Sequence, residues 1–372
     1  MSALRFCTGR GSVHQTARAE RSPEDKFNIE KLKRESTIDT IEPIGKLEEL
    51  DSGLFQKYGL TLLSGHQYAA FICAPDEQST DVPTIATTAW GTSLDGHNSI
   101  IGKSFMEVGN TVFYVGPEGG YHKGCGGNIS NSLARSAAAV LQFSLLAPEL
   151  APKSLQIDEI RRFLIGDSRG AMVGMGIKAF DKYFGQDIVF GDLTAACFPR
   201  RLNTLVDLPK LLRFVLQEPV AALKLLASIG PEAAFEYPST LDLINPFAVA
   251  HQLAMAPAIF SGEAGDLARL TPLDSALHMT TYNDDFVSMH NEWLKIFDKY
   301  SNVRITPLNG SHLTLADPLT RAFVLARNQA AREQYVPGID MNSATISERA
   351  HAIIEASDVR SHKIGRKLLL VV

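Results

Sequence analysis

The chain has 372 residues, of which 45% are hydrophobic and 21% charged, and its 36 basic and 41 acidic side chains give a formal net charge of −5. This length and composition predict a soluble globular protein with a large core, and they exclude a disordered or fibrous chain. The acidic balance, with no basic cluster, argues against nucleic acid as a partner. No run of about eighteen apolar residues predicts a membrane span, and the polar N-terminus lacks the apolar segment of a secretory signal.

The four cysteines, at positions 7, 73, 125 and 197, are far apart and form no CxxC pair. This usage supplies neither a disulfide framework nor a metal knuckle, so we expect reduced thiols and a cytoplasmic protein. The histidines and carboxylates show no H-E-x-x-H spacing, and we therefore expect no catalytic metal and no cofactor.

The N-terminal residues 1–50 are predicted to form a polar extension, with weakly ordered chain followed by charged helical turns. Two strands are then predicted at residues 60–63 and 68–74, joined by a turn at Ser64 and Gly65. The sequence leaves open whether the extension packs on the core, forms a contact in a homo-oligomer or stays disordered.

From residue 83 onward, segments typical of strands alternate with segments typical of helices. The predicted strands are 83–89, 111–115, 162–165, 187–191, 276–280 and 302–307, and the predicted helices are 99–108, 133–145 with Ser130 or Ser132 as its cap, 171–180, 290–300 and 318–334. Such alternation predicts the α/β class, with a mostly parallel central sheet covered by helices on both faces.

A different period interrupts this alternation at residues 202–262. Leucines recur there at helical spacing, broken by Pro209, Pro219 and Pro231, which predicts an inserted helical segment that packs on the core as a cap. The predicted organisation is an extension at 1–50, a core at 51–201 and 263–336, the cap at 202–262, and a less periodic C-terminal tail at 337–372.

The sequence Gly166-Asp167-Ser168-Arg169-Gly170 matches the pattern G-x-S-x-G and lies directly between a predicted strand and a predicted helix. A serine on such a sharp turn needs small neighbours, because strand and helix pass close to each other. Ser168 is therefore the candidate nucleophile.

A serine hydroxyl needs a general base, which a carboxylate orients in turn. His312 follows the strand at 302–307 through a Gly-Ser loop and is the candidate base; Asp284 and Asp285 follow the strand at 276–280 and are the candidate acids. Asp284 is slightly favoured, because Val287 follows it at a spacing common in hydrolases. Two outside candidates, Glu263 and Asp266, have no strand-to-helix unit around them.

Acyl transfer also needs donors for the developing oxyanion, commonly one amide after the nucleophile and one from an earlier strand end. The candidates are the N–H groups of Arg169 and of Thr92, which ends the sequence Trp90-Gly91-Thr92.

On these motifs, residues 59–334 outside the insert resemble an α/β-hydrolase-fold serine hydrolase of the esterase and lipase type. The resemblance implies about eight strands, with the cap inserted after the sixth, where residues 202–260 fall. The chain differs from the family at Trp90, because hydrolases often carry His-Gly-x at this place.

The sequence thus predicts a serine hydrolase that cleaves a carboxylic ester or related acyl substrate through a Ser-His-Asp triad and an acyl-enzyme. The apolar cap favours a small-molecule substrate with an apolar part. The alternatives are a peptidase or acyltransferase with the same triad, since fold and triad do not determine the leaving group, and a non-catalytic hydrolase-like binding protein.

Overall fold

The computed structural model describes most of the chain between residues 27 and 356. The described residues are 27–50, 53–75, 80–87, 97–118, 132–151, 156–203, 207, 209, 259–282, 289–308, 318–334 and 344–356. The predicted cap lies almost entirely outside them, so its helical character stays a prediction.

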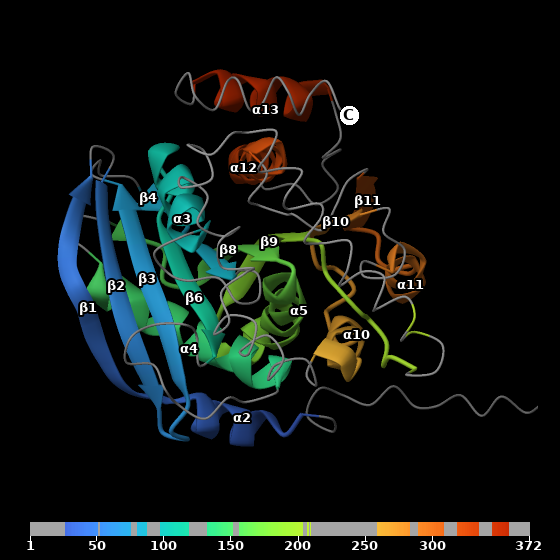
Figure 1. Cartoon of the computed structure of the whole chain (residues 1–372), viewed down its shortest axis with the longest axis horizontal. Coiled ribbons are helices and arrows are strands. Elements are labelled where there is room, and N and C mark those ends of the chain that lie inside the picture. Colours follow the sequence, from blue (N-terminus) through green and yellow to red (C-terminus); the bar gives the residue numbers. More distant parts are fainter. Residues whose placement is uncertain are drawn as a thin grey trace, which may run out of the picture.

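The described residues build one nine-stranded sheet (Figure 1). Its strands, in spatial order, are β1 (Ile38–Leu50), β2 (Gly53–Leu62), β3 (Gln67–Pro75), β6 (Val112–Glu118), β5 (Thr84–Thr87), β8 (Arg161–Asp167), β9 (Asp187–Thr194), β10 (Leu277–Tyr282) and β11 (Val303–Leu308). In this order, each strand from β6 to β11 is parallel to the next, whereas β1, β2, β3 and β6 pair with one another antiparallel. A separate pair is formed by β4 (Thr80–Asp81) and β7 (Gln156–Ile157).

Helices cover both faces of the sheet, as expected for a parallel sheet whose central strands are buried on both sides. One face carries α2 (Ile29–Ser36), α4 (Leu133–Leu150), α5 (Arg169–Phe180), α10 (Glu263–Ala268) and α11 (His290–Ile296), and the other carries α3 (His97–Glu107) and α12 (Pro318–Gln334) (Figure 1). A short 3₁₀ helix, η1 (Asp181–Phe184), leads from α5 toward β9. This arrangement confirms the predicted α/β class with a mostly parallel sheet between helices.

The N-terminal region contributes more to the sheet than the sequence predicts. The charged helical turns are present as α2, but residues 38–50 form β1, which pairs with β2 along its length. Because β1 is an edge strand, its side chains are half-buried or exposed and show no alternation of apolar residues. Charged side chains on an edge strand also oppose pairing with other molecules.

The C-terminal tail contains a helix that was not predicted. α13 (Ala344–Ala356) packs outside α12 through a small cluster that includes Ala326, Ile346 and Ala350 (Figure 1). The apolar surface that holds it is narrow and built largely of alanine, which leaves only a weak periodic signal.

The two ends of the predicted cap lie next to each other. The N–H of Leu202, where the chain leaves the core, donates to the carbonyl oxygen of Phe260, where it returns, at 3.1 Å. The insert therefore starts and ends at one place. Among the described helices, none is both long enough and apolar enough to cross a membrane.

Candidate active site

Ser168 stands on a strained turn between β8 and α5. Its backbone angles are φ 54° and ψ −115°, a conformation that costs a non-glycine residue about 1–3 kcal/mol and that persists only where the surroundings enforce it. The turn is held on one side by the Ser168 N–H, which donates to the Thr194 carbonyl oxygen of β9 at 2.8 Å. On the other side, the Thr87 hydroxyl at the end of β5 donates to the Gly170 carbonyl oxygen at 2.8 Å.

The turn needs glycine at position 166, as the motif predicts. A Cβ there would lie 2.8 Å from both the Ala171 Cα and the Gly170 carbonyl oxygen. Since both atoms belong to the backbone, neither can move aside without displacing the start of α5. The sequence motif and the strained geometry thus agree on the same serine.

The other predicted residues follow strands that end at the same edge of the sheet as Ser168. One row of paired residues crosses five parallel strands at this edge: Thr87, Gly166, Leu193, Met279 and Ile305. From that row the chain runs into the segments that carry Thr92, the Asp284 and Asp285 pair, and His312, all of which lie outside the described residues. Strands β10 and β11 are about 10 and 14 Å from β8, distances that loops and side chains of these lengths can span.

Arg169, whose N–H is the predicted first oxyanion donor, is the first residue of α5. The N–H groups of a first helical turn point out of the N-terminal end of the helix, which suits them to bind an oxyanion. Its side chain is only 3% exposed and donates to the Ser136 hydroxyl of α4 at 3.0 Å. The Arg169 guanidinium is therefore buried against α4.

The two outside candidates for the triad acid have other partners. The Glu263 carboxylate accepts from the backbone N–H groups of Leu133 and Ala134, at 3.0 and 3.1 Å, and from the Ser132 hydroxyl at 3.0 Å. It therefore caps the first turn of α4, together with Ser132, which confirms one of the two predicted cap residues. Asp266 makes an exposed pair with Arg269.

Backbone strain is concentrated around Ser168. Among the described residues, the non-glycine residues with positive φ are Ser168, Ala195, Phe198 and Met289. Ala195 and Phe198 lie in the segment that leaves β9. Met289 directly precedes α11, whose Trp293 indole donates to a carbonyl oxygen of that same segment. Strained residues cluster at functional sites, so the backbone points to the region selected by the motif.

A buried ionic network fixes the strands from which the predicted acid and base segments leave. Arg327 of α12 donates two hydrogen bonds to Asp192 of β9, at 2.6 and 3.1 Å. His278 of β10 lies 3.5 Å from the same carboxylate, and its other ring nitrogen contacts the Thr306 hydroxyl of β11 at 3.1 Å. Burial and the Arg327 charge lower the pKa of His278, and Asp192 opposes them.

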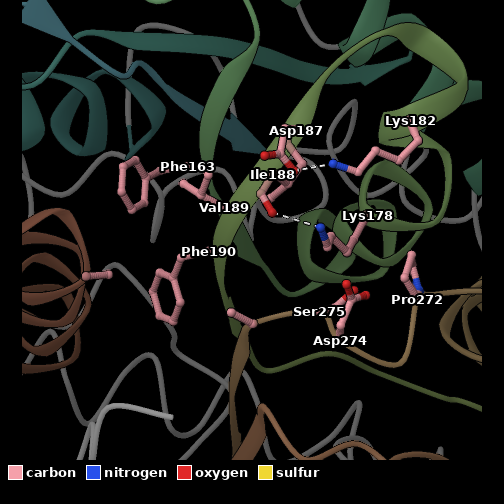
Figure 2. Close-up of a pocket in the computed structure, with 12 residues that line it drawn as sticks. Phe163, Lys178, Lys182, Asp187, Ile188, Val189, Phe190, Pro272, Asp274 and Ser275 are labelled. Atoms are coloured by element: carbon pink, nitrogen blue, oxygen red, sulfur yellow. Dashed lines mark hydrogen bonds and ion pairs between the residues drawn. The ribbon is translucent and has the colours of Figure 1, made fainter. Parts of the chain in front are cut away.

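A cavity of about 250 Å³ lies at the opposite ends of the strands (Figure 2). It is lined by Phe163 of β8, Phe190 of β9 and Lys178 of α5, among others, and Figure 2 shows Lys178 bonded to the carbonyl oxygen of Ile188. Five residues of extended strand, about 16 Å, separate Phe163 from Ser168. This cavity is therefore not the place where a substrate would meet Ser168.

No protein-family model and no curated protein sequence matches the chain. The structure is similar to the methylesterase BT1017, with a TM-score of 0.52 and 14% identity over 89% of this chain and 66% of that one. It is similar to DcsB, solved in complex with its substrate analogue, with a TM-score of 0.50 and 14% identity over 76% of this chain and 99% of that one. A thermostable carboxyl esterase from Bacillus coagulans also has a TM-score of 0.50, with 16% identity and the same coverage.

The chain has the α/β-hydrolase fold. The architecture that the resemblance implies is thus confirmed. The sheet has nine strands where about eight were expected, because β1 was not predicted. In the α/β-hydrolase fold a nucleophile stands on the turn between a central strand and its helix, which is where Ser168 lies.

One further side chain at this site, that of Cys197, belongs to no motif in the sequence. The Cys197 sulfur lies 3.9 Å from the Ser168 hydroxyl oxygen. The available signal was position alone, because Cys197 follows β9 by three residues and β9 ends at the edge of the sheet where Ser168 lies.

Proposed function

We propose that this protein is a serine hydrolase that cleaves a carboxylic ester, with Ser168 as nucleophile, His312 as general base and Asp284 or Asp285 as the orienting acid. The observation that carries the proposal is the strained backbone of Ser168 between β8 and α5. The esterases among the structural neighbours support the same reaction class.

In the proposed reaction the Ser168 oxygen bonds to the ester carbonyl carbon, and His312 takes the hydroxyl proton. The carbon–oxygen bond to the alcohol then breaks, and His312 returns the proton to the departing alcohol. Water repeats the sequence on the acyl-enzyme and releases the carboxylic acid. The N–H groups of Arg169 and Thr92 would stabilise each tetrahedral oxyanion, an effect of about 3 kcal/mol for one donor.

The test is hydrolysis of p-nitrophenyl esters by the wild type and by single variants. We expect Ser168→Ala and His312→Ala to lose about 1,000-fold or more of the activity. Of Asp284→Asn and Asp285→Asn, only one should lose a comparable share of the activity, since one carboxylate orients the base. His351→Ala, on the outer helix α13, is the matched control and should retain wild-type activity.

Activity that persists in Ser168→Ala would overturn the proposal. Cleavage of amides, or transfer to an added alcohol in place of hydrolysis, would keep the triad and change the reaction to that of a peptidase or acyltransferase. A folded wild type that binds esters without cleaving them would favour the non-catalytic alternative.

The apolar composition of residues 202–262 supports a substrate with an apolar part. The octanoyl ester should then be cleaved with a higher kcat/KM than the acetyl ester. Equal values for the two esters would contradict this part of the proposal.

A further inference from the structure

The segment that leaves β9 runs directly past the proposed nucleophile. Its Cys197 sulfur lies 3.9 Å from the Ser168 Oγ, within the distance of a hydrogen bond to sulfur, and both side chains are buried, at 5% and 7% exposure. The proposed mechanism gives this thiol no role.

The hydrogen of the thiol has its own acceptor. Cys197 Sγ donates to the carbonyl oxygen of Ala195 at 3.1 Å. A thiol carries one hydrogen, so the sulfur meets the Ser168 oxygen as a packing atom, and the serine hydroxyl keeps its single hydrogen for the base.

The segment cannot readily carry the sulfur away from the serine. The N–H of Ala195 donates to the Thr280 carbonyl oxygen of β10 at 2.7 Å, and the Trp293 indole of α11 donates to the Ala196 carbonyl oxygen at 3.0 Å. The ring of the next residue, Phe198, packs edge-on against Phe260, with 5.2 Å between ring centres.

Helix α10 closes the other side of the segment. A Cβ on Gly265 would overlap the carbonyl oxygen of Pro199, so the two backbones are in direct contact. Ala195 and Phe198, on either side of Cys197, have φ of 55° and 41°. Strain of this kind persists only where the surroundings determine the backbone, which means that the position of Cys197 is imposed by the fold.

We propose that Cys197 is a positioning residue for Ser168: its sulfur confines the serine side chain to the rotamer from which Oγ attacks. This inference rests on the proposed function. A serine side chain has three staggered χ1 wells, so losing the contact would spread the hydroxyl over more of them and lower the reactive fraction.

The experiment measures the second-order rate constant with which a fluorophosphonate labels Ser168, alongside kcat and KM for an ester. In labelling, the Oγ–P bond forms, the P–F bond breaks, fluoride leaves and the hydroxyl proton passes to the base. We expect Cys197→Ala to lower the labelling constant and kcat by about three- to tenfold with KM unchanged. Cys197→Ser, which keeps a polar atom at this place, should recover most of the rate.

The control is Cys73→Ala, which removes the other free buried cysteine among the described residues, in β3. It should label at the wild-type rate. An equal loss in this control would assign the effect to general packing and overturn the inference.

Cys197→Val keeps the experiment decisive if the alanine variant does not fold, because the branched valine side chain changes the space around the Ser168 Oγ without emptying it. Slow labelling of the folded valine variant supports the inference, and wild-type labelling of either the alanine or the valine variant overturns it. Absence of labelling in the wild type would instead overturn the proposed function.

Discussion

At the scale of single residues, the site is defined by backbone geometry that few sequences permit. Ser168 has a positive φ, and its turn is held by hydrogen bonds to β5 and β9. The energy stored in this turn must be balanced by packing around it, and Gly166 provides the space for that packing.

Gly166→Ala should destabilise the protein by about 1–3 kcal/mol, because the added Cβ meets backbone atoms of α5 that cannot move independently. Urea unfolding followed by circular dichroism measures the loss. The matched control is Gly59→Ala in β2, whose Cβ would make only an ordinary contact, 3.6 Å from Ile44 Cδ1. Equal stability of the two variants would contradict the account of the turn.

The sequence was sufficient to predict this residue and insufficient to predict its surroundings. G-x-S-x-G between a strand and a helix is a local pattern, and it predicts the sharp turn at Ser168. The contact between Cys197 and Ser168 joins residues 29 positions apart, and the burial of Arg169 depends on Ser136 in another helix. The spacing of apolar residues within one segment does not predict contacts between segments that are far apart in the sequence.

At the scale of elements, a single carboxylate connects α10 with α4. Glu263 begins α10, directly after the return of the insert, and accepts the first backbone N–H groups of α4. A negative charge at this end of a helix also interacts favourably with the helix dipole. The cap formed by Glu263 therefore fixes the point where the chain returns from the insert to the core.

Glu263→Ala should cost about 1–2 kcal/mol of stability, because it leaves first-turn amides of α4 without their acceptor. Thermal and urea unfolding both report the change. Glu292→Ala, which breaks an exposed pair with Lys295, should stay within about 0.5 kcal/mol of the wild type. A neutral Glu263→Ala variant would show that the cap adds nothing.

The predicted elements match the structure where a buried face imposes a period. β8, β9 and α12 fall close to their predicted bounds, since the two strands are buried and α12 presents one apolar side to the core. β1 escaped prediction because its residues are half-buried on an edge, and α13 because its contact is a few alanines. Weak burial gives a weak pattern.

At the scale of the whole molecule, a buried ion pair and the histidine beside it connect β9, α12 and β10. Asp192, Arg327 and His278 are all at most 4% exposed and come from β9, α12 and β10. Burial alone would raise the pKa of Asp192, but Arg327 and His278 outweigh it and lower that pKa. The carboxylate is thus kept ionised inside the core.

Stability should depend on pH because of His278, whose pKa burial lowers in the folded state. The unfolded chain binds a proton near pH 6.5 while the folded protein resists it, so stability is complete above pH 6.5 and falls below it, by up to about 1.4 kcal/mol per pH unit. Urea unfolding at pH 7.5, 6.5 and 5.5 measures this slope. His278→Gln should flatten it, and an unchanged slope in that variant would contradict the assignment.

Site-mapped labelling with a fluorophosphonate measures whether Ser168 is an activated nucleophile, as we propose. We expect the folded wild type to be labelled on the peptide that contains Ser168, and labelling to disappear in both Ser168→Ala and His312→Ala. A folded wild type that is not labelled, or labelling that survives either substitution, would contradict it.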